Sequence, residues 1–169
     1  MKKIIFFFVL LNIIPLNTKA EIAYIDINLI LNTSEVGKSL NAYLETIKNE
    51  DLEKYKIIES DLINKEKGLI AQQNILAKDE FQKKLNILTT EVQEYRSNKR
   101  TSMDELNKLK IEKTKEILKA LNPIITKYVD LNSISIVIPK KNIIIGKKKL
   151  DITDKIITLL NENIKKLKF

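Results

Sequence analysis

The sequence has no cysteine, histidine or tryptophan, and it has only three glycines and three prolines in 169 residues. Without cysteine and histidine, the chain cannot form a disulfide bond, a thiol or imidazole nucleophile, or the usual zinc ligand sets. Gly37, Gly68 and Gly146 are too far apart for a phosphate-binding loop. We therefore predict no catalytic, cofactor-binding or metal-binding residues, and we do not expect an enzyme. The scarcity of glycine and proline indicates a few long elements.

The N-terminus has the pattern of a secretory signal peptide. Lys2 and Lys3 precede an apolar run over residues 4–16, and small side chains follow up to Ala20. A helix of that run would span roughly 20 Å, which is shorter than the roughly 30 Å hydrocarbon core of a membrane. We predict that residues 1–20 are a signal peptide cleaved after Ala20, with an uncleaved anchor as the alternative.

Residues 38–131 have the pattern of a long antiparallel helical hairpin. They are rich in lysine, glutamate, leucine and isoleucine, and their apolar side chains recur at steps of three and four. Between two such runs, residues 71–79 lack a clear period, and we expect the reversal there. The narrow apolar seam favours a coiled coil, although Lys99 and Ser102 interrupt it. The seam positions are Leu40, Leu44, Ile47, Leu52, Tyr55, Ile58 and Leu62 in the first run, and Phe81, Leu85, Leu88, Val92 and Tyr95 in the second.

The two ends of the chain predict a small β-body. Residues 22–27, 133–138 and 142–146 have strand patterns, residues 28–32 could form one helical turn, and Asp151 is expected to cap a last helix. Asp26 is interpreted as a solvent-facing strand residue. The body, residues 21–37 and 132–169, is too small for a comfortable independent core, and the hairpin cannot bury its seam fully. Both features predict an oligomer.

The positive charge is concentrated in the C-terminal part. The whole chain has a formal charge of +8, but the hairpin carries only about +2, and residues 132–169 carry about +6. Two interpretations of these lysines stay open, contact with an anionic membrane surface and ordinary solvated turns. No aromatic-basic platform accompanies them, so we expect no nucleic-acid partner. The lysines concerned are Lys140, Lys141, Lys147, Lys148 and Lys149.

The order of these pieces resembles the Skp/OmpH family of periplasmic chaperones across essentially all of residues 21–169. The resemblance rests on the terminal segments, because any coiled coil would match the hairpin. These segments are Ile22-Ala23-Tyr24-Ile25-Asp26, Asn32-Thr33-Ser34-Glu35-Val36-Gly37-Lys38, Ile134-Ser135-Ile136-Val137-Ile138 and Leu150-Asp151-Ile152-Thr153-Asp154.

The resemblance implies a mainly α protein in which three subunits join their strands into a three-stranded β oligomerisation body. Three coiled-coil tentacles then surround a cavity that holds unfolded outer-membrane β-barrel proteins without ATP or any cofactor. The implied partners are those client proteins and two further copies of the chain, and the implied location is the periplasm. Tyr43, Tyr55, Phe81 and Tyr95 could line such a cavity, but packing in the seam is the simpler interpretation. The alternative function is a periplasmic coiled-coil adaptor or scaffold of an envelope secretion or efflux complex.

Overall fold

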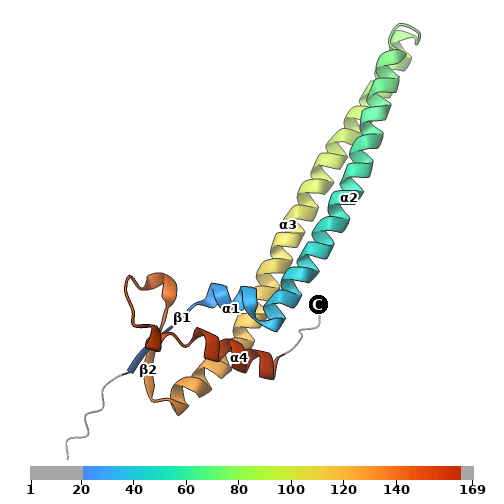
Figure 1. Cartoon of the computed structure of the whole chain (residues 1–169). Coiled ribbons are helices and arrows are strands. Elements are labelled where there is room, and N and C mark those ends of the chain that lie inside the picture. The colour runs from blue at the N-terminus through green and yellow to red at the C-terminus, as the bar shows by residue number, and fades with distance from the viewer. Residues whose placement is uncertain (1–20, 165–169) are drawn as a thin grey trace, which may run out of the picture.

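A computed structural model describes residues 21–164 of the chain. The predicted signal peptide, residues 1–20, lies outside the described residues. A long helical hairpin projects from a small body that contains both ends of the described chain (Figure 1). The elements in order are β1 (Glu21–Ile25), α1 (Ile27–Thr33), α2 (Glu35–Ala71), α3 (Lys78–Leu131), β2 (Ile134–Pro139), the short 3-10 turns η1 (Lys140–Asn142) and η2 (Lys148–Leu150), and α4 (Thr153–Asn163).

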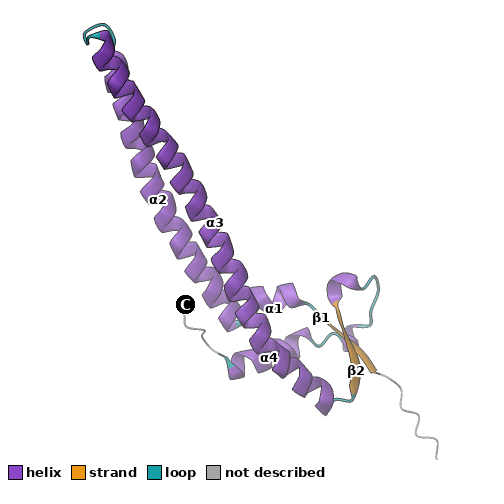
Figure 2. Ribbon diagram, turned by 180° about the vertical axis from the view of Figure 1, so that it is seen from behind, coloured by secondary structure: helices purple, strands orange, loops and turns teal. Residues whose placement is uncertain are grey.

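The hairpin consists of α2 and α3, which run side by side over most of their length (Figure 2). The reversal occupies residues 72–77, which confirms the prediction from the sequence. On α2 the buried seam residues Leu44, Tyr55, Leu62 and Leu69 recur at helical spacing. On α3 only Ile117 and Leu121 are fully buried. Most of the seam is therefore only partly covered, as a two-helix hairpin without a third partner requires.

The main core lies where the base of the hairpin meets the body. Ile30 of α1 and Val36 of α2 pack there with Ile156 and Leu160 of α4, and all four are 0% exposed. The buried residues Ile117 and Leu121 of α3 belong to the same cluster, together with Ala23, Ile25, Leu40, Leu44 and Ile152. Because both ends of the chain and both hairpin helices contribute, this core fixes the hairpin to the body.

The sheet of the described residues has two strands, β1 and β2, which pair in parallel. Tyr24 also forms a bridge to Asp151, with the Ile152 amide donating to the Tyr24 carbonyl at 3.0 Å. β1 therefore lies between β2 and the segment that precedes α4. Among the described helices, none is long and apolar enough to cross a membrane.

The prediction of a third strand over residues 142–146 is wrong for this chain. After β2 the backbone enters η1, and the following loop passes over β1, where a Cβ added to Gly146 would lie 2.9 Å from the Tyr24 ring. Ion pairs of Lys140 with Asp26 and Asp151 hold the turn on this side. The chain is thereby directed away from the outer edge of β2, where a third strand would have paired.

Candidate functional site

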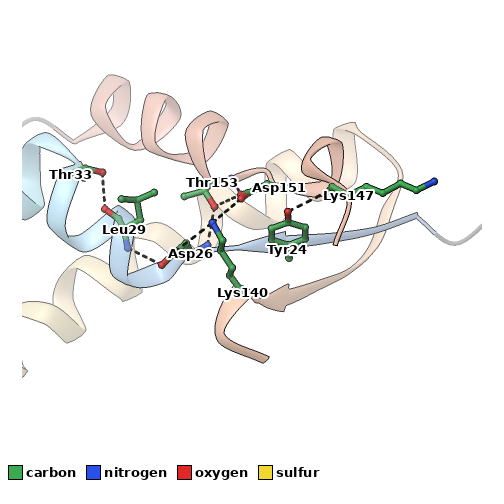
Figure 3. Close-up of polar contacts among 8 residues, drawn as sticks. All are labelled: Tyr24, Asp26, Leu29, Thr33, Lys140, Lys147, Asp151 and Thr153. Carbon is green, nitrogen blue, oxygen red and sulfur yellow. Dashed lines mark hydrogen bonds and ion pairs between the residues drawn. The ribbon is translucent and has the colours of Figure 1, made fainter. Parts of the chain in front are cut away.

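A polar cluster joins the two chain ends in the body (Figure 3). The Asp26 amide donates to Thr153 Oγ1 at 2.9 Å, and the Thr153 amide donates to Asp151 Oδ1 at 3.0 Å. Lys140 Nζ lies 3.3 Å from Asp151 Oδ2 and 3.9 Å from Asp26 Oδ2. The cluster therefore ties the end of β1 to η1 and to the start of α4.

The interpretation of Asp26 as a solvent-facing strand residue is wrong. Asp26 is the N-cap of α1, and its Oδ1 accepts a hydrogen bond from the Leu29 amide at 3.0 Å. β1 ends at Ile25, two residues before the end of the predicted strand, because the chain turns directly into α1, where the aspartate accepts from an otherwise unpaired amide.

The prediction that Asp151 caps the last helix is also wrong by one residue, because α4 begins at Thr153 with Ile152 as its N-cap. Asp151 Oδ1 nevertheless accepts a hydrogen bond from the Thr153 amide, the first of the helix.

The charges of this cluster support one another. A hydrogen bond to Asp151 and the charges of Asp151 and Asp26 raise the pKa of Lys140 above its usual value, although partial desolvation opposes them. Partial burial raises the pKa of Asp151, but the hydrogen bonds from Thr153 and Lys140 together outweigh it, and the net pKa lies below the usual value. Both groups remain charged at neutral pH, so the cluster stabilises the contact between the end of β1, η1 and the start of α4.

The structure separates the lysines that the sequence grouped. Lys140 joins the polar cluster, whereas Lys141 and the three lysines at 147–149 are exposed on the segment between β2 and α4. The Lys147 carbonyl accepts a 3.4 Å hydrogen bond from the Tyr24 hydroxyl, while its side chain extends away from the cluster (Figure 3). The same segment exposes 99% of Ile144 and 91% of Ile145.

The hairpin has a second polar cluster about halfway along its seam. The Tyr95 hydroxyl donates to Glu59 Oε2 at 3.0 Å and accepts from Lys99 Nζ at 2.9 Å. About two helical turns away, the Ser102 hydroxyl donates a hydrogen bond to Asp51. Lys99 and Ser102, which interrupt the apolar seam in the sequence, are therefore accommodated there by hydrogen bonds.

The aromatic residues Tyr55 and Tyr95 pack against each other in this seam. Their ring centroids are 5.9 Å apart in an edge-to-face arrangement, and Tyr55 is 6% exposed. This packing confirms the simpler interpretation for both residues.

Large apolar side chains are exposed along the hairpin. They are Leu52, Ile57, Ile63, Ile70, Ile75, Leu85, Ile87, Met103, Ile111 and Leu118. Leu52 and Leu85 were predicted at seam positions, but they are 56% and 37% exposed, so the prediction that they are buried in the seam is wrong. Most of the others do not follow the seam period, so the sequence pattern alone did not single them out. The hairpin surface can therefore offer many separate apolar contacts, which suits binding of a polypeptide.

Over residues 21–164 no group of three or more carboxylates is placed to hold a metal ion.

The fold places the chain in a class of proteins that present a long antiparallel helical hairpin on a small α/β body. A model of the family of outer membrane proteins (OmpH-like) matches residues 21–160, and the chain therefore belongs to the OmpH-like family. Among solved structures, a candidate outer membrane chaperone (OmpH-like) from Caulobacter crescentus is similar, with a TM-score of 0.82 at 20% identity. The match covers 89% of each chain. No curated protein matches the sequence.

Proposed function

We propose that this protein is an ATP-independent periplasmic holdase, which binds unfolded outer-membrane β-barrel proteins and prevents their aggregation in transit. The observation that carries the proposal is the exposure of isolated large apolar side chains along the hairpin, well beyond the body. Leu52, Ile57, Ile70 and Met103, for example, are each more than half exposed. Membership of the OmpH-like family supports the same function.

The hairpin surface suits such a client. An unfolded β-barrel chain exposes apolar side chains and unpaired strand edges that aggregate. Many weak contacts on long helices can hold clients of different sequence, whereas a rigid pocket would select one. An incompletely covered seam also lets the two helices adjust to a bound chain.

We further propose a homotrimer in which residues 21–37 and 132–169 form the oligomerisation body and residues 38–131 form the tentacle. β2 has only β1 as a strand partner within the described residues, so its other edge is available to a second copy. Ile136 is 53% exposed on β2, and Ile144 and Ile145, in the loop that follows β2, are nearly fully exposed. Burying these side chains between copies would supply the apolar core that one small body lacks.

The proposed location is the periplasm, with residues 1–20 as the export signal. Lys141 and the exposed lysines at 147–149 provide a positive surface on the body that would contact anionic lipid weakly and in a salt-dependent way, whereas the charge of Lys140 is paired with Asp26 and Asp151. The alternative is an adaptor role, in which the hairpin docks on an envelope complex and holds no client.

The test is suppression of aggregation. An outer-membrane β-barrel protein unfolded in urea is diluted into buffer with residues 21–169 of this chain, without nucleotide, and light scattering is followed. We expect suppression to reach its limit near about three chains per client. Serum albumin at the same mass concentration is the control for crowding. Scattering unchanged at several-fold excess would overturn the holdase proposal and favour the adaptor role.

A further inference from the structure

We propose that a groove between the end of α3 and α4 binds a lipid carboxylate with one acyl chain, such as a fatty acid. The inference goes beyond the proposed holdase function and does not depend on it. The groove lies at the base of the hairpin (Figure 1) and has a volume of about 570 Å³, which suits a ligand of the size of one acyl chain. Its larger apolar lining residues are Pro123, Ile124, Tyr128, Leu131, Leu159 and Ile164.

The charges of this α3–α4 groove select an anion. Lys127 of α3 and Lys155 of α4 line it, and no carboxylate does so among residues 21–164. Both lysines are exposed, and neither forms an ion pair with any residue that the structure describes. The grooves along the hairpin seam differ, because lysines and carboxylates line them together. An anion in the α3–α4 groove would therefore meet positive charge from both walls without displacing a carboxylate.

The groove has a cationic end and an apolar end. α4 runs against the direction of the last part of α3, so the end of α3 lies on the same side as the start of α4 (Figure 1, Figure 2). Lys127 is near the end of α3 and Lys155 is in the first turn of α4, so both lie toward that side. Ile164, which follows α4, lines the opposite end. A ligand with one charged head and one apolar tail matches this arrangement.

The walls of the groove favour an acyl chain over an extended peptide. Both walls are helices, whose backbone groups are bonded within the helix. The Thr158 hydroxyl donates to the Asp154 carbonyl at 3.0 Å, and Asn163 Nδ2 donates to the Leu159 carbonyl at 2.7 Å. An extended peptide would bury its N–H and C=O groups there without partners, which is costly, whereas an acyl chain needs no hydrogen bond along its length.

Apolar segments of the chain itself are poor occupants of the groove. Residues 165–169, which follow Ile164, contain three lysines, and the exposed Ile144 and Ile145 lie between Lys141 and Lys147 in the sequence. Either segment, from the same copy or from another, would bring positive charge against Lys127 and Lys155. The charge of the groove therefore favours an external anionic ligand.

The test is displacement of cis-parinarate, whose fluorescence rises in an apolar site, from residues 21–169 of this chain. Laurate is compared with dodecanol, which has an acyl tail of the same length without the charge, and both are kept below the concentrations at which they aggregate. K127Q/K155Q removes the two cations of the groove. K115Q/K119Q is the matched control, because Lys115 and Lys119 are exposed on α3 and do not line the groove. Circular dichroism checks that both variants are folded.

We expect laurate to displace the probe from about one site per chain and to bind about tenfold more tightly than dodecanol. K127Q/K155Q should weaken laurate binding about tenfold, and K115Q/K119Q less than about twofold. Equal affinities of laurate and dodecanol, equal effects of the two variants, or no displacement by laurate would each overturn the proposal.

Two further measurements separate the other occupants. A peptide of alternating phenylalanine and aspartate that displaces the probe more tightly than laurate would assign the groove to a polypeptide. Tighter binding of laurate to Leu167→Ser than to wild type would mean that the end of the chain occupies the groove. Either result would overturn the lipid assignment. The scattering assay decides the holdase function separately, because it does not require lipid.

Discussion

Gly37 at the start of α2 lies directly against the Leu31 carbonyl of α1. A Cβ added to Gly37 would stand 2.0 Å from the Leu31 oxygen and 2.7 Å from its carbonyl carbon. Ser34, which is fully buried between the two helices, caps α2 by accepting a 3.1 Å hydrogen bond from the Gly37 amide. This tight corner sets the direction in which the hairpin leaves the body, and only glycine permits so close an approach.

Gly37→Ala should therefore destabilise the protein. The methyl group would force α1 and α2 apart at a corner that belongs to the main core, at a cost of about 1–3 kcal/mol in the free energy of unfolding. Urea denaturation followed by circular dichroism, at one fixed protein concentration, measures the change. A stability equal to that of wild type would contradict the close contact.

Gly68→Ala is the matched change in the same helix, with the opposite expected sign. A Cβ at Gly68 would meet nothing within 4 Å. Alanine favours the helix more than glycine does, so the free energy of unfolding should rise by about 0.5–1 kcal/mol. The same denaturation experiment applies, and a loss of stability would show that the distal part of α2 is packed differently.

Asp151→Asn should reduce stability in a pH-dependent way. The substitution keeps the size of the side chain but removes the charge that Lys140 and Thr153 stabilise, at a cost of about 1–2 kcal/mol near neutral pH. Because the folded-state pKa of Asp151 lies below its usual value, this stabilisation is present above about pH 4. It is lost as the pH falls through the folded-state pKa.

Denaturation of wild type and of Asp151→Asn at a series of pH values measures this dependence. The difference between the two should be constant from about pH 5 to 8 and should shrink below about pH 4. A difference that stays constant down to pH 2 would mean that the ionised carboxylate contributes nothing.

Two tyrosine substitutions separate the packing and hydrogen-bonding parts of the mid-seam cluster. Tyr95→Phe keeps the ring against Tyr55 but removes the hydroxyl between Glu59 and Lys99, and it should cost less than about 1 kcal/mol. Tyr55→Ala removes a buried ring and should cost about 3 kcal/mol. Amide hydrogen exchange along α2 measures the local loss of stability. A larger loss for Tyr95→Phe than for Tyr55→Ala would mean that the hydroxyl contributes more than the buried ring.

The sequence predicted the hairpin and its reversal because both depend on local signals. Apolar residues such as Leu44, Tyr55 and Leu62 recur at helical spacing, and the period lapses where the turn forms between Ala71 and Lys78. The strands around Tyr24 and Ile136 were predicted from alternation in the same way. The N-cap role of Asp26 was missed because β1 turns directly into α1. An aspartate at that point can be interpreted equally well as the last residue of the strand or as the cap of the helix.

What the sequence by itself determined is therefore the set of long elements and the absence of thiol and imidazole chemistry, both of which follow from composition and spacing. The tertiary structure alone decided which side chains meet. It brought Lys140 to Asp26 and Asp151 across 114 and 11 residues of chain, and it directed residues 142–146 over Tyr24 instead of into a third strand. It also set Leu52 and Met103 on one side of the seam and Glu91, Glu94 and Glu105 on the other. The contacts in the body join segments that are far apart in the sequence, and the arrangement of the seam depends on how α2 and α3 are rotated against each other. No local sequence pattern encodes either.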